Sequence, residues 1–591
     1  MRKLTEREIE LLVEQGCSAE NWLGIEVEDD DFRVDAISNV NFYGSVSIGG
    51  LSGTIEVEEG FEKRCGIHHA TLRNVSIGSD CLIEKVNGYI SNYDIADGVY
   101  ISNVGVLNVQ GTPLFGNGTE VAVLNEGGDE NVVLYDKLTA QIAQLMLDNK
   151  AVRQMALREV SARPRMEHGT IGKGARIVGL RNMNNVLVGD ACDIQGASCL
   201  TESTILSSEE SPTFIGPDVI LESSIVAEGA TVTDGAKVYS SFVGESVHVG
   251  KGFSSEASVF FANAYMDNGE SCAAFCGPFA TSHHKSTLLI GGEFSFYNAG
   301  SNTNQSNHAY KMGPIHYGVL ERGAKTASGS HILWPAQIGS FTMVMGKLTQ
   351  HPDLRSLPFS YVMASEGRTY VVPGINVKTV GTWRDVNKWP KRDLRPRGNR
   401  KDLINFDFPN PFIIQSVLEG KKVLEKLVAE EDGDEFVYQN CRIKRSAAVK
   451  GIRYYDLAIK LFIRQVLNSS HDSGNDAGAD HWVDVCGLLA PQAEIQRIVD
   501  DVTSGAIGST EELTLVLQQI HADYAANAYD YAQQLMQNLG GSMFIDMDFW
   551  LKEAEEAYES WLHMVRDDAE HEYQLGDVSE EALRDFLAKV K

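Results

Sequence analysis

The chain of 591 residues is longer than one hydrophobic core usually organises, so two or three domains are expected. Its formal net charge of −30 argues against a general binder of nucleic acid or of an anionic membrane surface, since either partner would repel it. Nine scattered cysteines without a CxxC pair argue against a disulfide framework or a zinc site, and they fit reduced thiols in a cytoplasmic protein.

Residues 1–37 are expected to form an N-terminal helical cap. The segment from Met1 to Ile9 is a charged, amphipathic helix start without the apolar run of a secretory leader. No later uncharged run is long enough for a membrane-spanning helix. These features predict a cytoplasmic protein with no membrane partner.

An aliphatic residue followed by glycine or by another small or acidic residue recurs along residues 38–127 and again along residues 166–380. The spacing between aliphatic residues of equal phase is 18 for Ile77–Ile95, and 17 for Ile171–Val188, Val226–Val243 and Val232–Val249. Such a period describes a coil with three sides of about six residues, with aliphatic residues inside and small residues at the corners. The sequence therefore predicts a β-solenoid, a left-handed parallel β-helix of hexapeptide repeats, in a first segment and a main segment.

Residues 128–165 interrupt this pattern and are expected to form a helical insertion. Apolar residues from Leu138 to Met146 have the spacing of an amphipathic helix. The helix would lie against the solenoid or against a neighbouring subunit. The two solenoid segments would either stack directly or meet at an angle.

The repeat ends after Val371-Val372-Pro373-Gly374, and residues 411–591 are expected to form an α-helical domain. A basic linker over residues 381–410 joins the two parts. Its basic residues are Arg384, Lys388, Lys391, Arg392, Arg395, Arg397, Arg400 and Lys401. They could bind an anionic ligand such as a nucleotide or coenzyme A phosphate, with Trp383 and Trp389 as stacking surfaces, or they could dock onto the chain's own acidic surface.

The repeat resembles the hexapeptide-repeat transferase superfamily, which includes sugar acyltransferases, the acetyltransferase halves of sugar nucleotidyltransferases and γ-class carbonic anhydrases. The resemblance covers about residues 38–380 and specifies the fold far better than the chemistry. The layout is also similar to a group of long bacterial β-helix proteins with a helical C-terminal domain. The resemblance implies a homotrimer with sites in the grooves between neighbouring subunits.

A polar segment over residues 281–331 is the candidate site, because it breaks the repeat and holds five of the fifteen histidines. The resemblance implies one histidine that acts as general base on a sugar hydroxyl or amine, with acyl-CoA or acyl-carrier protein as co-substrate. His308 is the first candidate, followed by His284 and His316. Expected substrate contacts come from Asn302, Asn304, Asn307, Lys311, Arg322, Lys325, Arg355, Trp383 and Arg384.

These residues support a transferase that acts on an activated or phosphorylated sugar by acyl transfer. The first alternative is a non-catalytic scaffold, or a protein that binds a sugar phosphate or nucleotide. The second is a metal-dependent lyase of the γ-carbonic-anhydrase kind with His284, His308 and His316 as ligands, although the His308-x7-His316 spacing departs from that family's His-x4-His pair. No phosphate loop, GxGxxG or GxSxG motif occurs, which argues against an attached nucleotidyltransferase half.

Overall fold

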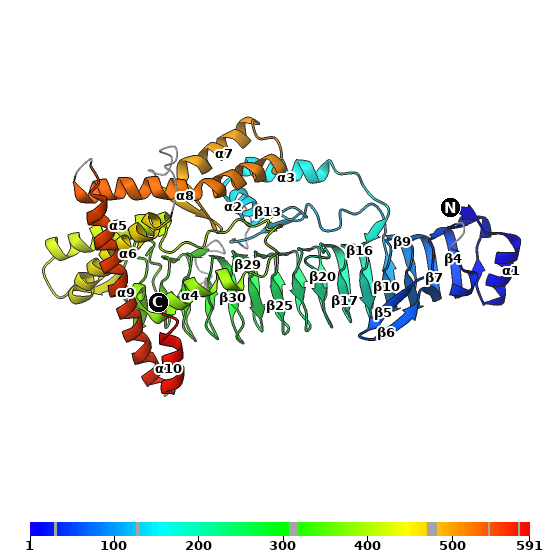
Figure 1. Ribbon diagram of the computed structural model, residues 1–591, viewed down its shortest axis with the longest axis horizontal. Coiled ribbons are helices and arrows are strands. Elements are labelled where there is room, and N and C mark those ends of the chain that lie inside the picture. The colour runs from blue at the N-terminus through cyan, green and yellow to red at the C-terminus, as the bar shows by residue number, and fades with distance from the viewer. Residues whose placement is uncertain are drawn as a thin grey trace.

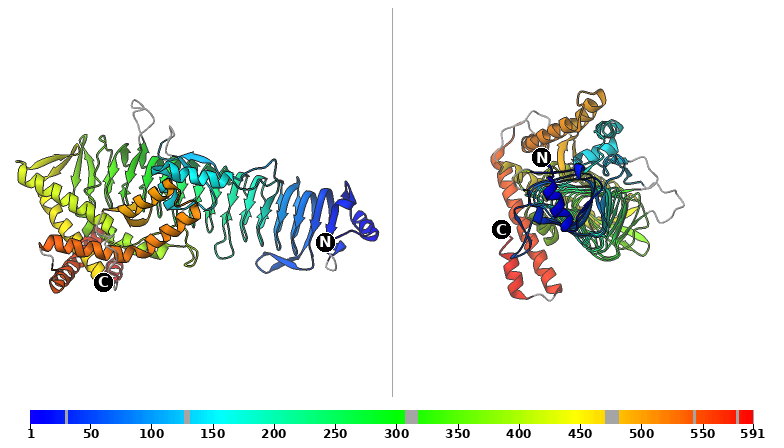
Figure 2. Two further views of the ribbon diagram at one scale, coloured as in Figure 1. Left: turned by 90° about the horizontal axis from the view of Figure 1, so that it is seen from above. Right: turned by 90° about the vertical axis from the view of Figure 1, so that its right-hand side faces the viewer.

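A parallel β-solenoid of about 18 turns runs through most of the molecule, and helices gather along its C-terminal half (Figure 1). The computed structural model describes residues 1–28, 32–125, 131–306, 317–469, 481–541, 544–576 and 579–590. The predicted fold class is confirmed, because 31 strands belong to one sheet that winds into coils. Figure 2 shows the same molecule from above and along the solenoid axis, where the coils enclose a common core.

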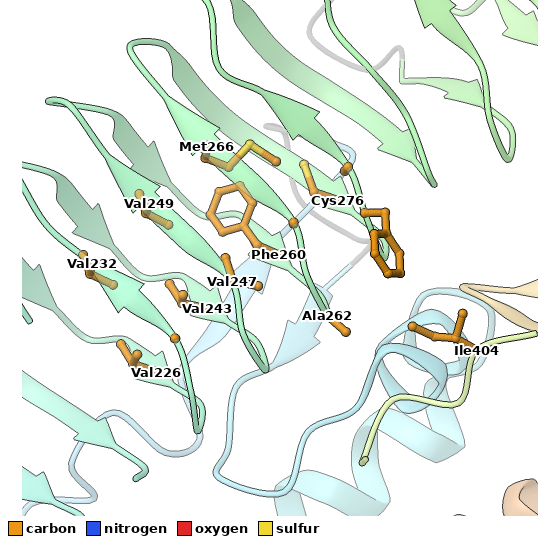
Figure 3. Packing of buried hydrophobic residues seen from close by; sticks show 14 of the residues in the cluster. Val226, Val232, Val243, Val247, Val249, Phe260, Ala262, Met266, Cys276 and Ile404 are labelled. Atoms are coloured by element: carbon orange, nitrogen blue, oxygen red, sulfur yellow. The ribbon is translucent and has the colours of Figure 1, made fainter. Parts of the chain in front are cut away.

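The repeat predicted from the sequence sets the register between coils. Val226 pairs with Val243, and Val232 pairs with Val249. The same holds for Ile77 with Ile95 and for Ile171 with Val188. The four valines are fully buried, and Figure 3 shows them stacked in the interior. Burial of one such side chain contributes about 1.5–3 kcal/mol, so each coil is stabilised by the coil that covers it.

The solenoid begins earlier than the predicted boundary at residue 38. Helix α1 (Glu6–Glu14) caps its end with a capping box between Thr5 and Glu8. The first strands already pair with the next coil. These N-terminal strands are β1 (Arg2–Lys3), β2 (Ser18–Ala19), β3 (Ile25–Val27), β4 (Ile37–Ile48), β7 (Gly66–Ile77), β8 (Leu82–Val86), β9 (Ile90–Ile95), β10 (Tyr100–Val104) and β11 (Val106–Asn108), with a protruding hairpin of β5 (Thr54–Glu58) and β6 (Phe61–Arg64).

The insertion leaves the solenoid without breaking it. It holds the hairpin β12 (Glu120–Ala122) and β13 (Asn131–Val133), then α2 (Ala140–Asp148) and α3 (Lys150–Ser161). Strands on either side of it pair directly, with Tyr100 opposite Arg176 and Leu107 opposite Met183. The two solenoid segments therefore stack as one continuous body, which decides between the two arrangements left open by the sequence.

Gly105 lies at this junction, and alanine there should separate the two coils. A Cβ at Gly105 would stand 2.0 Å from the carbonyl oxygen of Arg181, a backbone atom of the next coil. We expect Gly105→Ala to lower the free energy of unfolding by about 1–3 kcal/mol, as overpacking usually does. Gly398→Ala is the control, because no atom lies within 4 Å of its added Cβ. Equal urea unfolding midpoints for the two variants would contradict tight stacking across the insertion.

The coils after the insertion present three flat faces. The first, the helix-covered face, consists of β14 (Gly169–Ile171), β21 (Ile225–Val226), β24 (Phe242–Val243), β27 (Val259–Phe260), β33 (Gly318–Leu320), β36 (Gln337–Ile338) and the ends of β16 (Asn182–Val188), β18 (Cys199–Ile205), β29 (Glu270–Cys276) and β31 (Leu288–Phe294). The third face consists of β20 (Ile220–Glu222), β23 (Lys237–Tyr239), β26 (Ser254–Glu256), β32 (Asn304–Ser306), β35 (His331–Leu333) and the starts of those four strands.

The second face, called the groove face, carries the candidate site. Its strands are β15 (Arg176–Val178), β17 (Asp193–Gln195), β19 (Phe214–Ile215), β22 (Thr231–Val232), β25 (His248–Gly250), β28 (Tyr265–Asp267), β30 (Thr281–Ser282), β34 (Lys325–Thr326), β37 (Met343–Met345) and β38 (Tyr361–Ser365). They pair in parallel from coil to coil, partly through a single bridge residue, Asn298.

The C-terminal part is mostly helical, with short hairpins that the sequence did not predict. Its helices are α4 (Val380–Lys388), α5 (Pro411–Glu430), α6 (Arg445–Leu467), α7 (Gln492–Ser504), α8 (Thr510–Gly540), α9 (Met547–Leu575) and α10 (Glu580–Leu587), with 3-10 turns η3 (Ile375–Lys378) and η4 (Pro390–Arg392). Its strands are β39 (Arg368–Val372), β40 (Glu435–Tyr438), β41 (Cys441–Lys444), β42 (Trp482–Val485) and β43 (Leu488–Pro491). Among the described helices, none combines the length and apolar character needed to cross a membrane.

Helices from two distant parts of the sequence cover the helix-covered face. Outward residues such as Phe242 and Phe275 belong to one buried cluster with α2 and α3 of the insertion and with α7 and α8 of the C-terminal part. Figure 1 shows these four helices along one side of the solenoid. The helix of the insertion therefore lies against the solenoid of its own chain, one of the two positions that the sequence allowed.

Residues 380–402, called the returning segment, run back along the solenoid toward its N-terminal end. Successive residues contact successively earlier coils, which are one or two turns apart. The contacts are Asp385 with Lys325, Trp389 with Phe296, Asp393 with Asn263, Arg395 with Glu245 and Lys401 with Glu228. The segment therefore crosses the groove face as a second layer, with α4 in front of the strands near β30 in Figure 1.

Candidate functional site

A groove of about 650 Å³ lies between the groove face and the returning segment. Its floor is a column of outward residues from successive coils, Thr231, His248, Tyr265, Thr281, Asn298 and Lys325. Its second wall includes Asp385, Lys388, Trp389, Lys391, Arg392 and Leu394. Five lining residues are lysine or arginine and two are aspartate, so the groove carries an excess of positive charge in a strongly acidic protein.

His248 is held by a buried carboxylate. Its Nε2 lies 3.1 Å from Oδ1 of Asp267, whose side chain is fully buried. An ionised carboxylate only accepts hydrogen bonds, so Nε2 carries the proton and donates it to Asp267. Nδ1 of the neutral ring then keeps a lone pair, and no described residue donates a hydrogen bond to it. This arrangement is suited to a general base.

Tyr265 supports the His248 ring from the next coil. The two rings stack with centroids 4.3 Å apart and planes 17° from parallel. Tyr265 in turn meets His283 edge to face at 6.3 Å. Burial raises the pKa of Tyr265 and lowers the pKa of His283, so both side chains are expected to be uncharged near neutral pH. The stacking limits the imidazole of His248 to one orientation.

Lys251 occupies a backbone position that seldom holds lysine. Its φ of 49° is in the left-handed region, whereas the same corner carries Asp234 one coil earlier and Asn268 one coil later. Aspartate and asparagine tolerate this conformation better than lysine does. Nζ of Lys251 lies 2.7 Å from Oδ2 of Asp267, and this hydrogen bond raises the pKa of the lysine. Lys251 thus reaches, from a corner of the solenoid, the same carboxylate that orients His248.

Asp385 fixes the second wall to the floor. Its side chain is 1% exposed and pairs with Lys325 of the floor and with Lys388 of its own helix, the latter at 2.6 Å. Burial opposes its ionisation, but the two lysines outweigh burial and hold the pKa of this carboxyl below its usual value. Burial is also the main cause of the lowered pKa of Lys388.

Aromatic and amide contacts anchor the rest of this wall. Trp389 meets Phe296 at 4.8 Å between ring centroids. Asn263 donates to Asp393 at 2.9 Å and accepts from the backbone N–H of Leu394 at 2.9 Å. Residues of the same chain therefore form this side of the groove.

His308, the first candidate for the general base, lies outside the described residues. His308 and His316 are not described, and neither are Asn307 and Lys311. His284 is described and exposed, and its ring lies 4.2 Å from that of His283 at the edge of the groove. Among the described residues, no group of three histidine, cysteine or acidic side chains is arranged to hold a metal ion.

The other predicted substrate contacts are dispersed. Lys325 lines the groove, whereas Asn302 and Asn304 lie at a corner and on the third face. Arg355 is paired with Asp353 at 2.7 Å, away from the groove.

Arg322 is 3% exposed, and each of its three nitrogens contacts a protein acceptor, so its geometry supports a packing role in place of substrate binding. The acceptors are a carboxylate oxygen of Asp484 and the carbonyl oxygens of Asn405 and Gly487. Arg384 is exposed on the outer side of α4, and Trp383 faces a separate cavity of about 600 Å³ among the C-terminal helices.

Some basic residues of the linker dock onto the chain's own acidic surface, and others face the groove, where an anionic ligand could bind. Arg395, Arg400 and Lys401 dock onto acidic residues of the same chain, with Arg395 almost fully buried against Asp393 and Glu245. Lys388, Lys391 and Arg392 line the groove, as does Trp389. Among the described residues, Lys391 and Arg392 therefore face the groove without an aspartate partner, whereas Arg395, Arg400 and Lys401 bind the segment to the solenoid.

Residues 1–428, which include both walls of the groove, match the sequence model of a family described as a domain of unknown function, DUF4954. The chain belongs to the DUF4954 family. A second model, of a domain of unknown function named DUF6819, matches residues 463–577. In this DUF4954 chain that stretch runs from the end of α6 to the end of α9.

Two further comparisons concern single proteins. A protein of Treponema pallidum (strain Nichols), described as uncharacterized, is 26% identical over 426 residues, which is 67% of the DUF4954 chain and 57% of the relative. The chain thus spans little more than half of that relative. The solved structure of the UDP-N-acetylglucosamine acyltransferase of Francisella novicida is 13% identical, with coverage of 45% of this chain and 77% of that one and a TM-score of 0.14.

Sequence reasoning missed His248, Tyr265 and Asp267, although a signal for them was present. Thr231, His248 and Tyr265 follow each other at intervals of 17, the period already recognised for the valines. Alignment of the DUF4954 chain by that period places them in one outward column. The loosened repeat drew attention to residues 281–331, whereas His248 lies where the repeat is regular.

Proposed function

We propose that the groove is the active site of a transferase that moves an acyl group from a thioester to a hydroxyl or amine of a phosphorylated sugar, with His248 as general base. The observation that carries this proposal is the His248–Asp267 pair, in which a buried carboxylate orients an imidazole at the floor of a positively charged groove. The fold supports the same reading through its resemblance to hexapeptide-repeat acyltransferases.

The chemistry requires one proton transfer in each direction. As the oxygen or nitrogen of the acceptor bonds to the thioester carbonyl carbon, Nδ1 of His248 takes the acceptor's proton. The carbon–sulfur bond then breaks, and the imidazolium returns the proton to the thiolate. Asp267 stabilises the transient positive charge on the ring and keeps Nδ1 toward the substrate, as carboxylates do for other catalytic histidines.

The test is acceptor-dependent release of thiol. Purified protein is incubated with acetyl-CoA or an acyl-carrier-protein thioester and with a panel of hexose and hexosamine phosphates, and free thiol is measured over time. We expect release only with phosphorylated acceptors, because an uncharged sugar cannot use the excess of positive charge in the groove. The matching unphosphorylated sugars are the controls.

A different result would favour the second candidate, a non-catalytic protein that binds a sugar phosphate. That candidate draws on the same cationic lining. Calorimetric binding of the phosphorylated sugars without thiol release from either class of thioester would exclude acyl transfer and retain binding.

A further inference from the structure

The five cations that line the groove fall into two groups. Lys251, Lys325 and Lys388 are each paired with an aspartate of the groove. Lys391 and Arg392 also line it, but among the described residues no carboxylate lies within 4.0 Å of either side chain. Two adjacent cations without an internal counter-ion are available to an anion from outside the chain.

Their position along the solenoid brings them near His248. Trp389 contacts the coil of Phe296 and Asp393 contacts the coil of Asn263, so Lys391 and Arg392 lie between these two levels. His248 belongs to the coil just before that of Asn263. Neighbouring strands are about 4.8 Å apart, and the two levels lie one and three strands beyond His248, so the cations stand roughly 5–14 Å from the histidine along the axis. This range includes the length of one phosphorylated monosaccharide.

We propose that Lys391 and Arg392 form the phosphate-binding subsite of the groove, and that a single chain supplies the whole subsite. The inference rests on the proposed function, in that the phosphate belongs to the sugar whose hydroxyl or amine reacts at His248. It specifies the substrate as a monosaccharide with its phosphate close to the reacting group. It also replaces the neighbouring subunit with the returning segment of the same chain.

Intrachain contacts on both sides hold the subsite in place. Toward the C-terminus, Asn263 binds Asp393 and the backbone of Leu394. Toward the N-terminus, Asp385 is paired with Lys325 and Trp389 packs on Phe296. Because η4 is tied at both ends, its two basic side chains project from a fixed backbone, which lowers the entropic cost of binding an anion.

The test uses inorganic pyrophosphate as the probe, with isothermal titration calorimetry at low ionic strength on the full chain. We expect the double variant Lys391→Ala/Arg392→Ala to bind at least about tenfold more weakly than wild type. The matched control is Arg384→Ala/Arg397→Ala, which removes the same charge from exposed positions of the returning segment that do not line the groove. It should change the affinity by no more than about twofold.

Equal losses in both double variants, or no pyrophosphate binding by wild type, would overturn the subsite. The affinity should not depend on chain concentration, and an affinity that rises with concentration would mean that a second chain contributes. His248→Ala should bind pyrophosphate as wild type does. If these binding expectations are met but the protein has no transferase activity, the subsite is supported and the proposed function is excluded. If the protein is active but both double variants lose the same affinity for pyrophosphate, the proposed function is supported and the subsite is excluded.

Discussion

Replacement of His248 by alanine should lower the turnover number about 10²–10⁴-fold, the usual contribution of a positioned general base. The imidazole is the group of the groove whose lone pair is oriented by a buried carboxylate. Its side chain is partly exposed and its loss opens no large cavity, so the melting temperature should move little. Initial rates of thiol release at saturating acceptor and a thermal unfolding scan provide the two readouts.

Further variants make this result specific. His284→Ala removes an exposed histidine at the edge of the same groove and should leave turnover unchanged. Asp267→Asn should lower turnover while His248 remains, because an amide can present a donor to Nε2 and turn the ring's proton to Nδ1. Normal turnover in His248→Ala together with a large loss in His308→Ala or His316→Ala would restore the hypothesis drawn from the polar segment.

Replacement of Asp402 by alanine should destabilise the fold by about 3–5 kcal/mol, since it breaks a buried network and leaves its partners unsatisfied. Asp402 is 4% exposed and accepts backbone hydrogen bonds from Ala140 at 2.8 Å and from Ala262 at 2.9 Å. It therefore joins the start of α2 to a coil of the solenoid. Urea unfolding followed by circular dichroism measures the change.

The control for Asp402 is an exposed residue of the same type. Asp432→Ala should alter the free energy of unfolding by no more than about 0.5 kcal/mol. Asp402→Asn keeps one acceptor oxygen and should fall between the two. A loss below about 1 kcal/mol in Asp402→Ala would mean that the returning segment, the insertion and the solenoid are held together elsewhere.

The sequence predicted those parts of the fold that depend on a local period. The interval of 17 residues places Val226 over Val243 in any solenoid of this kind, because each inward position must meet the inward position of the next coil. Likewise, the apolar spacing in the insertion predicted the helix that became α2.

The path of the returning segment was not predictable in the same way. Its anchors join residues far apart in the sequence, such as Lys401 with Glu228 and Asn263 with Asp393. No sequence period relates these positions, and many other acidic residues of the chain could have formed ion pairs with the basic linker. The candidate site contains residues of both kinds. His248 is placed by the periodic column, whereas Arg392 is brought to the groove by long-range packing of the returning segment.

The two sides of the groove are synthesised at different times, because the returning segment follows the coils of the floor in the sequence. Chains emerge from the ribosome N-terminus first, and coils such as those of His248 and Tyr265 can stack as soon as they are made. The second wall follows more than a hundred residues later, and it must travel back over coils that are already finished. A nascent chain therefore displays the floor of the groove without its second wall until residues 380–402 have been made and have folded back over the coils.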